Sequence, residues 1–479
     1  MMDAIFSWCA RRAGADRTFL RVPALVTALS FGMAAHIAPA SAQVAAQADR
    51  TVFTVIVTRH GVRAPSGLEK SKYEWATWGE VKPDELTAHG YRLMRLMGRF
   101  YAKTQSDKRL PVDCPGKSAY VYADTAQRTL GTAHALIEGL CGSPDALEVF
   151  HAAGADGGAA FKDPMFDATE WLLKQRKIDI LVASRAAVVA AAGSPSSSLV
   201  MRHKDEFATF QRLLDSRCPD GGCQPIAAAA SVIQVDNLAG LKGPIATAST
   251  YAEDVYLEFA QCRPEDKLTS LDGKELRTAL QGGMRLHVLA YDVNARNRYN
   301  PLVRGGTLLA HVVAMLGQKA GRREVLGRIR LPDLDGKTLV ILSGHDTELG
   351  SLGGILDAHW DLEGGNMRDD MPPGSALIFD LVKRGNDYGV HLGFVSMALD
   401  QYRNEKSFDG PLAAVHYPGC TERNCVMPLA QFESLALTLD AQGLVDESWD
   451  ASPSRLPQDP GSSANLKDPP WTEPQCRGP

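Results

Sequence analysis

The chain has 479 residues, of which 45% are hydrophobic and 22% charged, and its formal net charge is −5 at pH 7. The hydrophobic content excludes a wholly disordered chain, and 43 Gly and 27 Pro are too few for a fibrous one. The mild negative charge, without long runs of basic residues, argues against a nucleic-acid-binding protein. The length allows one large domain with an insert or several smaller domains.

The first fifty residues have the layout of a secretory signal peptide. Four arginines precede an apolar run at 23–37, which is followed by the small-residue triplet Ala40-Ser41-Ala42. We predict a signal peptide over residues 1–42 and a periplasmic or secreted protein without membrane association after cleavage. The alternative, an N-terminal anchor that is never cleaved, is disfavoured because the apolar run is short for a membrane span.

The cysteines indicate disulfides in an oxidising compartment. Nine are present, and Cys9 falls in the predicted leader, which leaves an even number. None of the spacings is typical of a zinc site. Cys262 and Cys476 are left over from the local pairs and would hold the C-terminal tail, although spacing does not settle their pairing. The three pairs predicted from their closeness in the chain are Cys114 with Cys141, Cys218 with Cys223, and Cys420 with Cys425.

In chain order, buried strands alternate with amphipathic helices. Short β-branched runs are typical of strands buried on both faces. Thr87 is a suitable N-cap for the first helix. The predicted strands span 52–57, 119–122 and 338–342, and the predicted helices span 88–102 and about 126–140.

The middle of the chain has helical periodicity and few strand signals, and strands return near 374–398. This order predicts an α/β fold with a mostly parallel central sheet, flanked by helices and interrupted by an inserted α-helical domain. The clearest helices of the insert are expected at 203–214, 252–260 and 276–294. The predicted division is 43–164 with 321–450 as the α/β domain, 165–320 as the helical insert and 451–479 as an extended tail.

Unusual polar residues follow the predicted strands. The first strand leads into Thr58 to Pro65, and the third leads into Ser343 to Thr347. Ligands of open α/β sheets bind beyond the carboxyl ends of strands. Arginines buried at such an edge need partners, and their guanidinium groups match phosphate oxygens. Arg128, in the first turn of the helix after the second strand, is unfavourable at a helix N-terminus unless an anion binds there.

The segment Arg59-His60-Gly61-Val62-Arg63-Ala64-Pro65, together with His345-Asp346, resembles the signature of the histidine acid phosphatases. Within that family the chain resembles the bacterial exported branch, which includes periplasmic phytases and glucose-1-phosphatases. The resemblance extends over residues 51 to 445. Further matching stretches are 86–90, 124–129, 344–354, 371–374 and 420–425.

The resemblance implies an acid phosphatase that acts on small-molecule phosphate monoesters. His60 would be the nucleophile that forms a phosphohistidine, and Asp346 would protonate the leaving alcohol. Arginine charges would lower the pKa of His60 and stabilise the transferring group, so no metal or cofactor is expected. The residues expected to hold the phosphoryl group are Arg59, Arg63, Arg128 and His345.

Substrate identity depends on positions outside the signature. The phytase-like subgroup usually has Asn where this chain has Glu348, and a Lys where this chain has Ser66-Gly67. An added carboxylate and a missing cation should both weaken binding of a polyanionic inositol phosphate. The further residues that could line the substrate cleft are Thr347, Glu348, Lys70, Lys72, Lys204 and Arg304.

Four alternatives stay open. A purely structural secreted protein would need none of this chemistry. An exported protein could bind phosphate esters through the arginines without turning them over. A dedicated phytase would share the site but prefer inositol phosphates. A phosphoglycerate-mutase-like enzyme shares the Arg-His-Gly opening, but the predicted export and the His345-Asp346 pair argue against it. We expect the mature protein to be a monomer.

Overall fold

The computed structural model describes residues 49–446 and 466–476, apart from short gaps. The gaps are 69–70, 115, 153–162, 194–196, 220, 323–325, 327, 411, 423–424 and 474–475. The predicted signal peptide, Lys70 and most of the predicted tail therefore lie outside the described residues.

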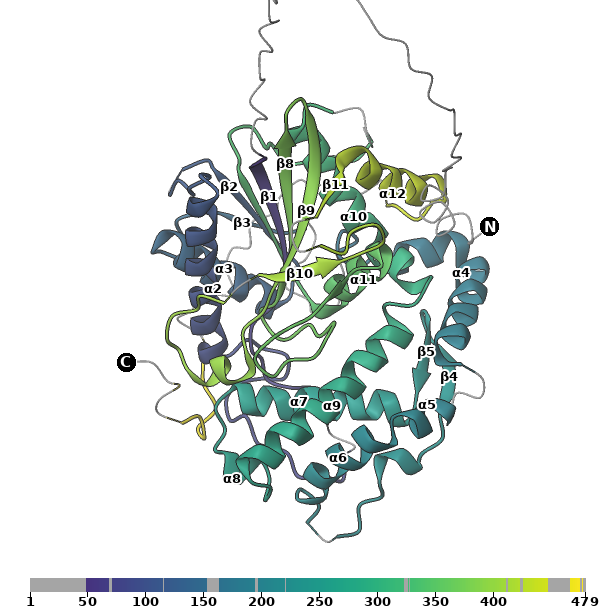
Figure 1. The fold of residues 1–479 in the computed structure, drawn as a ribbon. Helices are drawn as coiled ribbons and strands as arrows, with labels where there is room; N and C mark the ends of the chain where they lie inside the picture. Colours follow the sequence, from purple (N-terminus) through teal and green to yellow (C-terminus); the bar gives the residue numbers. More distant parts are fainter. Residues whose placement is uncertain are drawn as a thin grey trace, which may run out of the picture.

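One large sheet organises the molecule, and its strand order is β3-β2-β6-β1-β8-β9-β10-β7, with β11 paired to β9 (Figure 1). The four neighbours β3, β2, β6 and β1 are parallel, whereas β8 and the strands beyond it pair antiparallel. The strands are β1 (Arg50–Arg59), β2 (Ala119–Ala123), β3 (Val149–Phe150), β6 (Leu339–Gly344), β7 (His359–Trp360), β8 (Ala376–Arg384), β9 (Asp387–Val395), β10 (Ala413–His416) and β11 (Val426–Pro428).

The predicted α/β fold is confirmed, with the parallel pairing in the half of the sheet from β3 to β1. Strand β1 shows why these strands appear in the sequence as apolar runs. Ile56 packs into one core, together with α2 (Ala88–Asp107) and α3 (Gln127–Cys141). Val55 and Val57 pack into a second core on the other face, with α10 (Asn300–Lys319), α11 (Asp346–Leu356) and α12 (Leu429–Ala441). Alternate side chains of a strand face opposite sides of the sheet, so a strand covered on both sides needs apolar residues throughout.

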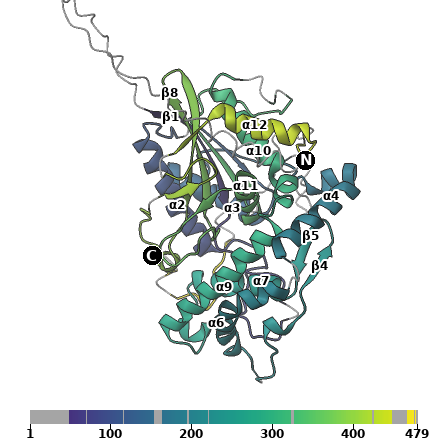
Figure 2. The same ribbon diagram turned by 45° about the vertical axis from the view of Figure 1, so that its right-hand side comes forward.

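The helical insert, by which we mean the elements from α4 to α9, lies beyond one end of the sheet (Figures 1 and 2). It contains a two-stranded hairpin that the sequence patterns did not predict. Helix α7 begins eight residues before the predicted 252, and α9 begins three before 276. Its elements are α4 (Thr169–Ala192), α5 (Ser197–Arg202), α6 (Lys204–Asp215), β4 (Val232–Val235), β5 (Ala239–Lys242), α7 (Pro244–Ala260), α8 (Glu265–Leu268) and α9 (Gly273–Asn294).

Helix α10 lies within the predicted insert range 165–320 but packs against α11 and α12 on the face of the sheet. Its Gly305 is in close contact with Ser351 of α11, because a Cβ on Gly305 would lie 2.7 Å from the Ser351 Cβ. We therefore propose that the helical insert ends before α10 rather than at residue 320.

Four disulfides join the cysteines as predicted, including the pair that spacing left open. The Cα–Cα distances are 5.5 Å for Cys114–Cys141, 6.0 Å for Cys218–Cys223, 6.2 Å for Cys262–Cys476 and 5.5 Å for Cys420–Cys425.

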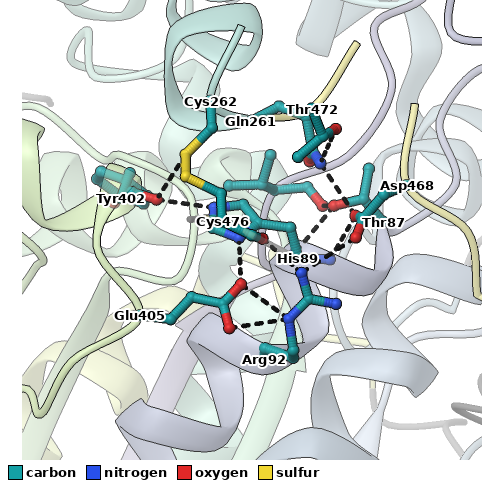
Figure 3. A network of polar contacts seen from close by, with 12 residues as sticks. Thr87, His89, Arg92, Gln261, Cys262, Tyr402, Glu405, Asp468, Thr472 and Cys476 are labelled. Carbon is teal, nitrogen blue, oxygen red and sulfur yellow. Dashed lines mark hydrogen bonds and ion pairs between the residues drawn. A yellow bond between two sulfur atoms is a disulfide. The ribbon is translucent and has the colours of Figure 1, made fainter. Parts of the chain in front are cut away.

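The described end of the tail is held against α2 and the end of α7 (Figure 3). Asp468 accepts a hydrogen bond from the His89 backbone N–H at 2.7 Å and pairs with Arg92 at 3.0 Å. Trp471 lies edge-on to Trp78, with ring centroids 5.1 Å apart. Together with the Cys262–Cys476 disulfide, these contacts make residues 466–473 and Cys476 a strap that joins α2 to the helical insert.

Candidate active site

The parallel strands bring the predicted motifs to one edge of the sheet. Arg59 at the end of β1 is level with Gly344 at the end of β6. The backbone N–H of His60 donates to the Gly344 carbonyl at 2.9 Å, and that of Asp124, after β2, donates to the Ser343 carbonyl at 2.9 Å. The residues that follow the three strands are therefore neighbours, although they lie far apart in the chain.

His60 is buried, with 2% of its surface exposed. Its Nδ1 lies 2.8 Å from the Gly61 carbonyl oxygen, and a carbonyl can only accept, so Nδ1 carries the hydrogen in the neutral ring. That tautomer leaves the Nε2 lone pair available. Burial lowers the pKa of His60 well below its usual value, and the charges of Arg128 and Arg59 lower it further. The arrangement can therefore keep a neutral, nucleophilic imidazole in acidic solution.

A glycine after His60 is required by close packing. A Cβ on Gly61 would lie 2.7 Å from Met94 Cγ and 3.0 Å from the Gly90 carbonyl oxygen, both on α2. Here glycine allows α2 to approach the strand end closely. The Gly61 N–H donates to Thr132 Oγ1 of α3 at 3.0 Å, so the loop is held between the two helices.

Three arginines surround His60. Arg59 is 1% exposed and donates to the Met371 carbonyl, while Arg63 donates to the Ala64 carbonyl at 2.9 Å. Arg128 lies in the first turn of α3, as predicted, and burial together with the Arg63 charge lowers its pKa. Within the described residues, the buried Nε atoms of all three guanidinium groups lack a hydrogen-bond acceptor. Buried donors without partners are uncommon, and oxyanion oxygens would satisfy them.

Asp346 is the first residue of α11 and forms an ion pair with Arg59, with Oδ2 2.9 Å from Nη2. Burial acts to raise the pKa of Asp346, but the Arg59 charge and a hydrogen bond from Tyr291 outweigh it and lower the pKa below its usual value. In this state Asp346 is ionised. A bound phosphate dianion would share the charge of Arg59 and raise the protonated fraction of Asp346.

His345 is the N-cap residue of α11, and its ring lies edge-on to that of His60, with centroids 5.4 Å apart. Its Nδ1 lies 3.4 Å from Asp124 Oδ2 and 3.6 Å from Glu348 Oε2. Burial acts to lower the pKa of His345, but the contact with Glu348 and the nearby carboxylate charges raise it above the usual value. The pKa values of the two histidines of the site, His60 and His345, are thus shifted in opposite directions.

The helical insert contributes two residues that the sequence patterns did not identify. Glu253 of α7 forms ion pairs with Arg59 and with Arg63, the latter at 3.4 Å. Tyr291 of α9 is hydrogen-bonded to Asp346. Both belong to helices whose periodicity predicts only packing, so no local signal marks them as site residues. A substrate phosphoryl group would have to share the two arginines with Glu253.

The structure does not bring together the other residues predicted to bind substrate as it does the arginines and histidines of the site. Thr347 donates its hydroxyl to Glu348 Oε1 at 3.3 Å, and Glu348 is 4% exposed. Lys72 and Lys204 are exposed, and Arg304 is on α10. Within the described part of the chain, no hydrogen bond or ion pair joins these three cations to the site, and their roles stay predictions.

Comparison with known proteins shows which proteins this chain resembles. Residues 52–184 match the family model described as the histidine phosphatase superfamily (branch 2). The phytase AppA of Escherichia coli (strain K12) is 28% identical over 403 residues, which cover 77% of this chain and 87% of the relative. A glucose-1-phosphatase of Providencia rettgeri is 25% identical over 277 residues, which cover 52% of this chain and 60% of the relative.

Solved structures agree with these matches. The apo phytase of Hafnia alvei superposes with a TM-score of 0.69 at 27% identity and covers 83% of this chain and 97% of its own. The same phytase in complex with myo-inositol hexakis sulphate superposes with a TM-score of 0.69 at 26% identity and covers 85% of this chain and 99% of its own.

The fold and the matches together make this chain similar to the histidine-type acid phosphatases, and the similarity supports phosphoric monoester hydrolase activity. The predicted resemblance to the branch that contains bacterial phytases and glucose-1-phosphatases is confirmed by the named relatives.

Proposed function

We propose that this protein is an exported acid phosphomonoesterase that works through a phosphohistidine on His60. The observation that supports this most directly is the buried His60 ring, with Nδ1 held by the Gly61 carbonyl and the depressed pKa caused by burial and three arginines. A binding protein would need the arginines, but it would not need a neutral imidazole with one nitrogen left reactive.

In the first step, the His60 Nε2 lone pair attacks phosphorus, and the bond between phosphorus and the ester oxygen breaks. Asp346, protonated in the substrate complex, gives its proton to the departing alkoxide oxygen, so an alcohol leaves. Arg59, Arg63, Arg128 and the His345 imidazolium neutralise the charge on the three equatorial oxygens.

In the second step, water attacks phosphorus and the phosphorus–nitrogen bond breaks. The ionised Asp346 takes a proton from that water, which returns both residues to their starting forms and releases phosphate. The mechanism favours acidic solution because Asp346 must be protonated to donate, whereas the depressed pKa of His60 keeps that ring neutral at the same pH.

Export is part of the proposal. The predicted signal peptide lies outside the described residues, but four disulfides support a periplasmic or secreted protein. The structure, over the residues it describes, contains no helix that is both long and apolar enough to span a bilayer. We propose a monomer with small-molecule phosphate monoesters as its partners and with no role in nucleic-acid binding.

The test of the nucleophile is His60→Ala. We expect hydrolysis of a chromogenic phosphate monoester to fall by at least about 10³-fold, because covalent capture is lost. In the native protein, rapid acid-free quenching with ³²P-labelled substrate should trap one labelled histidine, and peptide mapping should place the label at His60.

His203→Ala, at the partly exposed N-cap of α6, is the matched control and should retain full activity. Hydrolysis that survives in His60→Ala would refute the nucleophile assignment. Tight binding of the monoester by the native protein without turnover would favour the binding-protein alternative instead.

A further inference from the structure

Glu348, which differs from the asparagine usual in phytase-like sequences, is turned into the protein. It occupies the third position of α11, and only 4% of its surface is exposed. Its carboxylate accepts a hydrogen bond from the His345 backbone N–H at the start of the helix. A carboxylate in this position is engaged by the protein and does not project toward a substrate.

The same carboxylate faces the His345 ring. Glu348 Oε2 is 3.6 Å from Nδ1, and Asp124 Oδ2 is 3.4 Å from the same nitrogen. Two carboxylates at one ring nitrogen require that nitrogen to carry a hydrogen. Nε2, on the opposite side of the ring, has no hydrogen-bond acceptor within the described residues, so it is the nitrogen available to a ligand.

Charged and ionisable groups of several elements lie near His345 in the described part of the chain. The carboxylates are Asp124 from the loop after β2, and Glu348 and Asp346 from α11. The positive or ionisable neighbours are Arg128 from α3 and His60 after β1. Burial and Arg128 disfavour the imidazolium, so the neighbouring carboxylates must supply the opposing attraction.

We propose that Glu348 is a positioning residue that, with Asp124, keeps His345 protonated and directs its Nε2–H toward the transferring phosphoryl group. The proposal rests on the proposed phosphatase function and deepens it. His345 then adds a fourth positive donor to the three arginines. Glu348 acts on the substrate only through His345.

The sign of the pH dependence follows from the geometry. The raised pKa of His345 means that the imidazolium is complete in acidic solution and is lost as the pH rises through that value. Burial raises the pKa of Asp124, so the attraction between Asp124 and the imidazolium weakens as the pH falls. Removing the Glu348 charge should therefore move the loss of anion binding to lower pH.

Glu348→Gln tests this, because glutamine can still accept the backbone hydrogen bond at the third helix position but carries no charge. Sulfate is a suitable probe, since its own charge does not change between pH 4 and 8. We expect the pH at which sulfate inhibition weakens to fall by about one unit, which corresponds to roughly tenfold weaker inhibition at intermediate pH. At the acidic end, inhibition should stay within about twofold of native.

The matched control is Glu275→Gln, because Glu275 occupies the same third position of α9, far from the strand ends and half-exposed. It should leave the sulfate profile unchanged. A direct readout is the NMR titration of the His345 ring protons, assigned by their absence in His345→Gln. The His345 pKa should fall in Glu348→Gln and stay at the native value in Glu275→Gln.

Asp124→Asn is the second variant, should Glu348→Gln fail to fold, and it should shift the same titration in the same direction. An unmoved His345 titration and a superimposable sulfate profile in Glu348→Gln would overturn the proposal. A uniform loss of sulfate binding at every pH would also overturn it, because it would indicate a purely structural role. The NMR titration of His345 requires no turnover, so failure of His60 as the nucleophile would be recognised separately.

Discussion

At the scale of single residues, the two histidines of the site have different surroundings, which give them different protonation states. His60 faces arginines and a backbone carbonyl, and its pKa is lowered by burial and positive charge. His345 faces Asp124 and Glu348, and its pKa is raised despite burial. One ring is therefore neutral while the other is charged in the same acidic solution, and the two can serve as nucleophile and phosphate ligand respectively.

Asp346→Asn tests the proton donor. Esters with poor alcohol leaving groups should lose about 10² to 10⁴-fold in rate, because general acid catalysis contributes that much. Activated aryl esters, whose leaving groups depart without a proton, should lose far less. Steady-state rates for an alkyl and an aryl phosphate at acidic pH provide the comparison.

The control for this prediction is Asp357→Asn, at the opposite end of the same helix. Asp357 has a positive φ of 47°, which asparagine tolerates, and its side chain is about half-exposed. Equal losses for both ester types in Asp346→Asn would argue that Asp346 only orients Arg59.

The site residues differ in how far sequence could predict them. His60, Arg59 and Asp346 follow buried strands in recognisable segments, and the structure brings them together at one edge. Glu253 and Tyr291 could not be predicted, because each is one polar residue in a helix. Their position in the site depends on how the helical insert packs over the edge of the sheet at which the parallel strands end.

At the scale of elements, the predicted strands of the parallel half were found because continuous apolar runs mark strands covered on both faces. Helix α10 lies in the stretch predicted to be helical but was not among its three clearest helices, and most of its side chains are buried. The hairpin β4–β5 was also missed, since two four-residue strands leave little pattern.

The strap yields a stability prediction. The Cys262–Cys476 disulfide closes a sequence separation of 214 residues, whereas Cys218–Cys223 closes only 5. Loop-closure entropy predicts roughly 5 kcal/mol for the long loop against about 2 kcal/mol for the short one. The double variant Cys262→Ser/Cys476→Ser should therefore unfold at a clearly lower denaturant concentration than Cys218→Ser/Cys223→Ser.

Denaturant unfolding followed by tryptophan fluorescence measures both, and the strap residue Trp471 provides a local probe. Equal unfolding midpoints for the two double variants would show that the Asp468 contacts hold the strap without the disulfide.

At the scale of the whole molecule, the net charge is modest, although positive charge is concentrated at the site. The formal charge is −5 and the pI about 6.2, so the chain becomes net positive in the acidic range where Asp346 can donate. That overall charge should attract anionic substrates, and salt should screen the attraction.

Phytate and a chromogenic monoester, assayed together near pH 5, test the substrate range. We expect phytate to be hydrolysed with a kcat/KM at least about tenfold below that of the aryl ester, because no lysine or arginine beyond Arg59, Arg63 and Arg128 is tied to the site by a described contact. Raising the ionic strength should increase KM for phytate more than for the monoester. A kcat/KM for phytate equal to or above that of the monoester would favour the dedicated-phytase alternative.

The sequence by itself determined the buried strands, the chemistry at their ends and the even set of cysteines, because these depend on short-range patterns of hydrophobicity and residue type. Only the tertiary structure decided that Cys262 meets Cys476, that Glu253 and Tyr291 complete the site and that Glu348 faces inward. These depend on contacts between segments far apart in the chain, which packing of the helical insert and the strap against the sheet domain brings together.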